Sequence, residues 1–231
     1  MLTLSQIRSL DHAVELMYHP LATEIPTKRM CLEAIKDLFT YLPQSKANPD
    51  DADVRVKLFL ACYSSLFPFL YTGGVGLSHS IGHAIGATYA IPHGITSCLS
   101  LAPTVHFKAS NAEEANQIAR IVPYIGKQST GSDEKDSHVV GDAIAGLVEE
   151  LGHKTTLTAV CLYNQRVLDP SLTFPKYHVP IGDEEEEAIA GRALHSKEHK
   201  DFANCKLAIG RFMACQANHI ITVKQIVHDL Y

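Results

Sequence analysis

The chain has 231 residues, of which 46% are hydrophobic and 19% are charged, so it can bury a sizeable core and is not expected to be disordered as a whole. The formal net charge is -5, and no stripe of Lys and Arg stands out, which argues against a nucleic-acid partner. No window is apolar over the length of a membrane span, and charge comes too early at the N-terminus for a signal peptide. We therefore expect a cytoplasmic protein without a membrane partner, in which the scattered cysteines are reduced.

Helical periodicity dominates the chain, because apolar residues recur at steps of three and four. Thr27 is a plausible N-cap for the second helix, and Pro92 suits the first turn of the fifth. Alternating strand patterns are scarce, so we predict an all-α fold in a single helical domain, residues 1–231. The predicted helices lie at about 4–17, 27–42, 51–61, 78–90, 92–105, 111–122, 139–151 and 183–194, with a polar loop at 126–137.

A histidine-rich segment, residues 76–94, carries the strongest chemical signal. His79 and His83 are four residues apart and share a helix face, while His93 follows a proline at the start of the next helix. A tight turn can bring His93 back beside His79, and imidazoles held on rigid elements are good ligands for a divalent cation. The alternative is that these are three hydrogen-bonded structural histidines.

The stretch GLSHSIGHAIGATYAIPHGITSCLSLAP resembles the H-x3-H-x9-H segment of iron-containing alcohol dehydrogenases, most closely their maleylacetate reductase-like branch. The resemblance implies a helical bundle like the C-terminal, dehydroquinate synthase-like domain of that family. It also implies that His79 and His93 ligate Fe²⁺ or Zn²⁺, and that His83 relays a proton or orients substrate. The family's D-x3-H motif is matched in its tail by His12-Ala13-Val14-Glu15, so His12 takes the place of a further metal ligand.

This second motif departs from the family pattern four residues before His12, where Arg8 replaces the aspartate. Arg8 shares a helix face with His12, so it is expected to weaken metal binding and to suit a substrate carboxylate, which a guanidinium grips bidentately. Asp11 is expected to point off that face, and Glu15 lies one turn further on. The alternative is that Arg8 is a solvated helix residue.

Members of this family join the helical domain to an N-terminal α/β domain that binds NAD(P). Here the resemblance begins almost at Met1, and Gly73-Gly74-Val75-Gly76 lies between helices, so it is not a dinucleotide fingerprint. We therefore expect a truncated form that needs a nucleotide-binding domain from elsewhere. The resemblance covers residues 5–158 and 177–202, and residues 159–176 and 203–221 are predicted to be family-atypical insertions.

Three functions remain open from the sequence. The resemblance implies an oxidoreductase acting on a carbonyl or enone of a small, acidic metabolite, with His83 and Arg8 as catalytic residues and a homodimer or a full-length paralogue as partner. The second is a non-redox isomerase, dehydratase or cyclase of specialised metabolism that uses the same pocket. The third is a non-catalytic remnant or regulatory partner. His106, outside these motifs, is interpreted as a partner of a helix C-terminal dipole.

Overall fold

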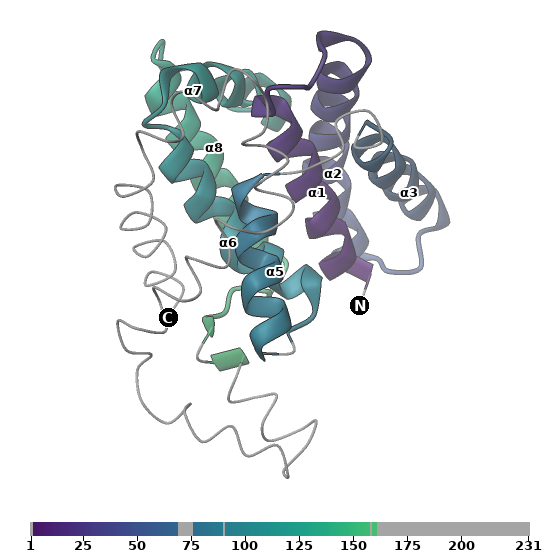
Figure 1. Cartoon of the computed structure of the whole chain (residues 1–231). Helices are drawn as coiled ribbons and strands as arrows, with labels where there is room; N and C mark the ends of the chain where they lie inside the picture. The colour runs from purple at the N-terminus through teal and green to yellow at the C-terminus, as the bar shows by residue number, and fades with distance from the viewer. Residues whose placement is uncertain (1, 69–75, 90, 158, 161–231) are drawn as a thin grey trace.

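The computed structural model of the chain describes residues 2–68, 76–89, 91–157 and 159–160. All regular structure in these ranges is helical, which confirms the all-α prediction (Figure 1). The elements in chain order are α1 (Leu2–Tyr18), η1 (Glu24–Lys28), α2 (Arg29–Ala47), α3 (Ala52–Leu66), α5 (Leu77–Tyr89), α6 (His93–Lys108), α7 (Ala112–Ala119), η2 (Val122–Ile125) and α8 (Asp133–Glu150).

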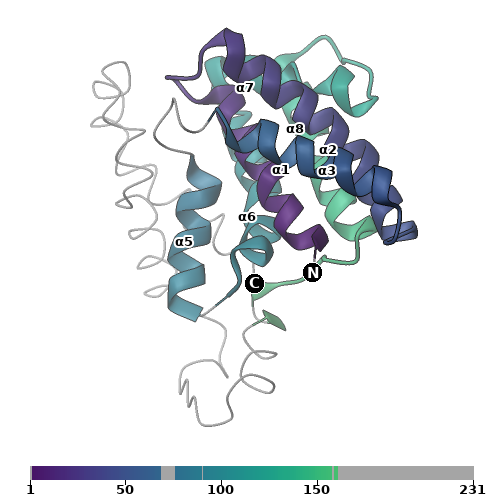
Figure 2. The same cartoon turned by 90° about the vertical axis from the view of Figure 1, so that its right-hand side faces the viewer.

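Helix α1 is the central element of the bundle. It packs against α2, α3, α6 and α7 and also contacts α5, and Figure 2 shows α6 between α1 and α5. Its apolar side chains Ile7, Leu10, Val14 and Met17 are fully buried, as the helical spacing of the sequence predicts. A helix that is enclosed on several sides can present buried polar side chains to more than one neighbour.

The second helix does not begin as predicted, because Thr27 is not its N-cap. Helix α2 starts at Arg29 after Lys28, which makes no side-chain cap, and the hydroxyl of Thr27 instead lies 3.2 Å from the hydroxyl of Thr23. The helix also continues through Pro43 to Ala47. Packing of its apolar face on the core therefore outweighs the helix-breaking tendency of one proline.

Helix α8 begins at Asp133, six residues before the predicted start, so the polar segment 126–137 is only partly a loop. The Ser132 side chain caps the helix by accepting from the Lys135 amide. Acidic residues in the first turn complement the positive end of the helix dipole. Apolar periodicity missed this start because capping and charge, rather than hydrophobic spacing, define the first turn.

Two glycines let α6 lie close to its neighbours. A Cβ added at Gly94 would meet the Leu4 carbonyl oxygen of α1 at 2.6 Å, and one at Gly82 of α5 would meet the Thr96 hydroxyl of α6 at 2.9 Å. Because Gly94 follows His93 directly, the same close contact brings His93 to the N-terminal half of α1.

The predicted helix at 183–194 and the predicted insertions beyond Val160 lie outside the described residues, as do Gly73 to Val75. Among the helices that are described, none is long and apolar enough to cross a membrane.

Candidate metal and substrate site

Four histidines from three helices converge, as the sequence predicted. The ring of His12 on α1 stacks on that of His79 on α5, with centroids 4.6 Å apart. The His93 ring on α6 lies 5.2 Å from the His79 ring and 4.9 Å from the His83 ring. His83 is further from His79, at 6.4 Å. Imidazoles from two distant stretches of the chain therefore form one cluster.

The cluster has a buried end and an open end. His79 and His12 are only 2% and 7% exposed, and His93 is half-buried. His83 and Arg8 are exposed. This gradient places the two buried imidazoles deep in the bundle, and it places His83 and the guanidinium where a small molecule from solvent can reach them.

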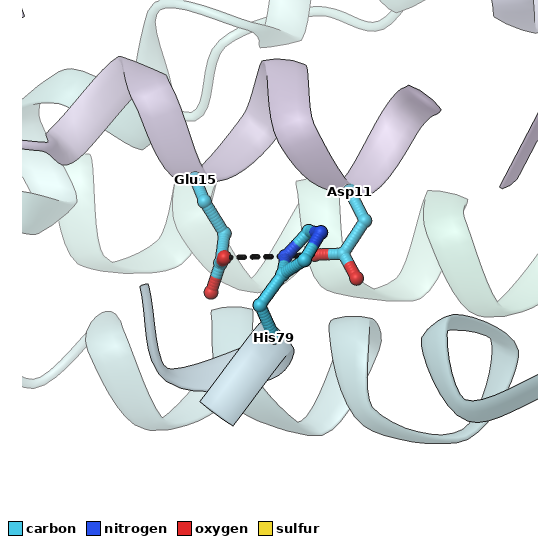
Figure 3. Close-up of side chains that lie close together, drawn as sticks. All are labelled: Asp11, Glu15 and His79. Atoms are coloured by element: carbon cyan, nitrogen blue, oxygen red, sulfur yellow. Dashed lines mark hydrogen bonds and ion pairs between the residues drawn. The ribbon is translucent and has the colours of Figure 1, made fainter. Parts of the chain in front are cut away.

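The buried end contains two carboxylates that the sequence analysis did not assign to the site. Asp11 and Glu15 of α1 flank the His79 ring in Figure 3. The Nδ1 atom of His79 lies 2.8 Å from Glu15 Oε2 and 3.4 Å from Asp11 Oδ1. Asp11 does lie off the face that carries Arg8 and His12, as expected, but its own face lies against α5, so Asp11 reaches the site. Asp11 and Glu15 are four residues apart, and that spacing predicts a second polar face of α1 but not that α5 covers it.

Glu15 also holds the beginning of α5 in place. Its carboxylate accepts hydrogen bonds from the backbone amides of Gly76 at 2.7 Å and Ser78 at 2.6 Å. The Ser78 hydroxyl donates to Asp11 at 3.0 Å. A Cβ at Gly76 would lie 2.8 Å from Glu15 Oε1, so a glycine leaves room for the carboxylate. An anion at a helix N-terminus is favourable because unpaired amides and the helix dipole meet it there.

Electrostatics divides the histidines into two kinds. Burial, together with the charges of His79 and Arg8, lowers the pKa of His12 to about 2 and that of His93 to about 4. Burial also opposes the charge on His79, but Asp11 and Glu15 outweigh it and raise that pKa to about 10. His12 and His93 are therefore neutral at pH 7, the state in which imidazole binds metals. The influence of Arg8 on both rings places its charge close to the cluster.

Two of the predicted ligands offer buried ring nitrogens to a divalent cation. The Nε2 atoms of His79 and His93 are buried and have no hydrogen-bond partner among the residues that the structure describes. Two imidazoles that ligate one tetrahedral Zn²⁺ have ring centroids roughly 5 Å apart, comparable to the 5.2 Å between these rings. Among the described residues, the group whose ligand atoms all lie within 4.8 Å of one another is Asp11, Glu15 and His79, whereas His12, His79 and His93 do not form such a group. In the group with Asp11 and Glu15, however, the His79 nitrogen already bonds to Glu15.

His106 lies in the last turn of α6, outside this site. Its Nδ1 atom is 2.8 Å from Nδ1 of His138, and its Nε2 atom is 3.4 Å from Oδ1 of Asp142, both on α8. Burial lowers the pKa of His106, and the neighbouring His138 lowers it further.

The chain belongs to the Fe-containing alcohol dehydrogenase family, because the family model for the C-terminal domain matches residues 4–167. It is 31% identical over 123 residues to the NAD-dependent methanol dehydrogenase of Bacillus methanolicus, which covers 53% of this chain and 31% of that protein. It is 30% identical over 115 residues to the maleylacetate reductase of Sphingobium indicum, covering 50% of this chain and 32% of that protein.

Solved structures show the same fold. The alcohol dehydrogenase from Oenococcus oeni superposes with a TM-score of 0.74 at 18% identity, covering 99% of this chain and 51% of that one. Maleylacetate reductase from Rhizobium sp. strain MTP-10005 gives 0.66 at 16% identity, covering 99% and 52%. The chain thus spans about half the length of these structures and about a third of the curated relatives.

Proposed function

We propose that this chain is the substrate and metal domain of an NAD(P)-dependent oxidoreductase that reduces a carbonyl or enone of a small, acidic metabolite. The relatives' names supply the reaction class, since they include dehydrogenases and reductases. The observation that carries the proposal is the convergence of His12, His79 and His93, of which two have buried Nε2 atoms without a hydrogen-bond partner among the described residues. The dinucleotide would be bound by a nucleotide-binding domain, as the family resemblance implies.

His12, His79 and His93 would hold Fe²⁺ or Zn²⁺. A divalent cation in this position would supply Lewis acidity to a carbonyl oxygen. The protein's own contribution is to keep two of the three imidazoles neutral by burial and to hold all three on packed helices. Arg8 would weaken metal binding at this site. Its guanidinium stands where the family has an anionic ligand, and its positive charge repels a cation.

Arg8 and His83 would act on the substrate at the open end. A carboxylate bound by Arg8 would offset the guanidinium charge and orient the reacting carbonyl toward the histidines. His83 is exposed, with its ring 4.9 Å from that of His93, so it can exchange protons with water and pass them to the reduced oxygen. This arrangement favours acidic substrates over neutral ones.

A non-redox reaction is the second candidate. Acid–base chemistry by His83 beside a carboxylate anchored on Arg8 needs no dinucleotide, and both residues lie on the accessible side of the cluster. An isomerase, dehydratase or cyclase of specialised metabolism would use the same substrate contacts. The two candidates differ in whether NAD(P)H binds.

Fluorescence titration with NADH and NADPH separates them, first with the chain alone and then with an equimolar full-length family member. With acetoacetate as a small keto-acid probe, the proposal predicts that the mixture oxidises more of the reduced dinucleotide than the full-length member does alone. If the chain binds acetoacetate but neither binds the dinucleotide nor increases its oxidation, with or without the full-length member, the non-redox candidate is favoured. If the chain binds neither the dinucleotide nor acetoacetate, the remaining candidate is a regulatory partner of its paralogue.

A further inference from the structure

We propose that Glu15 is a positioning residue that keeps the proton of His79 on Nδ1 and thereby turns Nε2 toward the histidine cluster. The inference rests on the proposed metal-dependent function and adds a residue to it. Glu15 does not touch a substrate or a cation in this account, but acts through the orientation and tautomer of His79.

The hydrogen bond between these residues has a defined direction. A carboxylate oxygen accepts and does not donate, so the hydrogen in the 2.8 Å contact between Glu15 Oε2 and His79 Nδ1 comes from the imidazole. Nδ1 therefore carries a proton, so a metal can bind this ring only through Nε2, which gives up its own proton when the cation binds. That Nε2 is buried without a hydrogen-bond partner in the described part of the chain.

Glu15 is itself fixed by other donors. Its two oxygens accept from the backbone amides of Gly76 and Ser78 at the start of α5, and the Tyr18 hydroxyl lies 3.3 Å from Oε1. With His79 included, four donors fill the roughly four lone-pair positions of a carboxylate. The side chain is fully buried, so neither water nor an alternative rotamer competes for these donors.

Because hydrogen bonds already occupy the Glu15 carboxylate, one of two possible positions for a cation is favoured. A cation among Asp11, Glu15 and His79 Nδ1 would displace the Nδ1–H bond and compete with two backbone amides for the same carboxylate. A cation on the opposite edge of the ring would leave all of these bonds intact. A carboxylate bonded to the far nitrogen of a ligating histidine fixes the ring and raises its basicity, and loss of such a partner typically weakens metal affinity by about 10- to 100-fold.

The test compares Zn²⁺ affinity, measured by competition with a chromophoric chelator, in the wild type, Glu15→Gln, Gly76→Ala and the control Glu149→Gln. A glutamine amide can donate to Nδ1 and so favours the opposite tautomer. We expect Glu15→Gln to bind Zn²⁺ about 10- to 100-fold more weakly. Gly76→Ala should weaken it in the same direction by displacing the carboxylate without removing its charge. Glu149 is exposed and pairs with Lys154, so its variant should match the wild type.

Nitrogen-15 NMR of the His79 ring supplies a readout that a purely structural role would not move. In the Zn²⁺-loaded wild type we expect the metal on Nε2 and the proton on Nδ1. Zinc on Nδ1, or folded Glu15→Gln and Gly76→Ala variants with wild-type affinity, would overturn the inference. If Glu15→Gln does not fold, the Zn²⁺ affinity of Gly76→Ala and the nitrogen-15 spectrum of the wild type test the inference.

Failure of the proposed function gives a different result. If the wild type binds no Zn²⁺, the metal-dependent function fails, and the metal-free spectrum still decides the inference. A proton on Nδ1 that is hydrogen-bonded in the wild type and changed in the Gly76→Ala variant supports the role of Glu15. An unprotonated Nδ1 overturns it.

Discussion

The imidazole rings of His12 and His79 stack with centroids 4.6 Å apart, although they come from the first helix and from the histidine-rich segment beyond the third. Two buried, stacked imidazoles in a helical bundle need a reason, because burial disfavours their charge and leaves ring nitrogens to be satisfied. Carboxylates satisfy one nitrogen of His79. The proposed cation would satisfy the opposite edge and link this ring to His93.

Replacing Arg8 with aspartate should strengthen metal binding. The change removes a positive charge that acts on both His12 and His93 and introduces a carboxylate one turn from His12. We expect Zn²⁺ to bind roughly ten-fold more tightly, the size of one hydrogen bond to a charged group, in a competition titration. Ser5→Asp, which adds a carboxylate at an exposed position of the same helix, is the charge control. Equal Zn²⁺ affinities in the wild type, Arg8→Asp and Ser5→Asp would show that Arg8 does not act on the metal site.

Removing the guanidinium should weaken the binding of acids. Arg8→Gln is expected to raise the dissociation constant for acetoacetate by about ten-fold, because a charge-assisted hydrogen bond is lost, while binding of the neutral ketone 2-pentanone changes little. Isothermal titration calorimetry measures both. Arg55→Gln, an exposed arginine on α3, is the matched control. Similar losses for acid and ketone would show that Arg8 does not select the carboxylate.

The glycine that brings α6 against α1 can be tested by stability. Gly94→Ala places a Cβ 2.6 Å from the Leu4 carbonyl oxygen, a backbone atom that cannot move without shifting the helix. We expect the free energy of unfolding to fall by about 1–3 kcal/mol, as for other overpacked sites, in urea titrations followed by circular dichroism.

Gly146→Ala in α8 is the control for that experiment, since nothing lies within 4 Å of the added Cβ. There the alanine should leave stability unchanged or raise it by about 0.4–1 kcal/mol through helix propensity and chain entropy. A loss of stability at Gly146 equal to that at Gly94 would show that the close approach of the helices is not the cause.

His19 should make the fold sensitive to acid. Burial lowers the pKa of this histidine from 6.5 to about 4, against the opposing effect of Glu15, and its Nδ1 accepts the Leu21 amide at 3.2 Å. Below pH 6.5 the unfolded chain takes up a proton at this position, and the folded chain does so only near pH 4. Its contribution to stability is therefore complete above pH 6.5 and is lost as the pH falls toward 4.

The variant His19→Asn isolates this effect, because the asparagine oxygen can still accept the Leu21 amide but does not titrate. As the pH falls from 6.5 to 4, we expect the free energy of unfolding of the wild type to fall more than that of the variant. Urea titrations at several pH values measure it. A difference that stays constant with pH would contradict the assignment.

Much of this architecture could be predicted from the sequence, because regular apolar spacing along α1 and the H-x3-H-x9-H spacing both report directly on helix faces. The convergence of His12 with His79 and His93 was predicted from the family resemblance and is confirmed by the ring distances. The start of α8 at Asp133 was missed, because polar caps carry no hydrophobic period.

Asp11 was not assigned to the site, and the reason is physical. A helix wheel fixes which residues share a face, but not which face a distant helix will cover. Arg8 and His12 mark one face of α1, and the fold brings the start of α5 onto a neighbouring face that carries Asp11 and Glu15. The carboxylate pair became a recognisable part of the site only when the contact between α1 and α5 was known.

Metal content tests the central claim most directly. Wild type and His79→Ala are expressed side by side, reconstituted with Fe²⁺ or Zn²⁺ without oxygen, freed of unbound ions, and measured by inductively coupled plasma mass spectrometry. We expect close to one metal ion per wild-type chain and little in the variant. Equal metal content in both proteins, or none in either, would contradict a cation held by His12, His79 and His93.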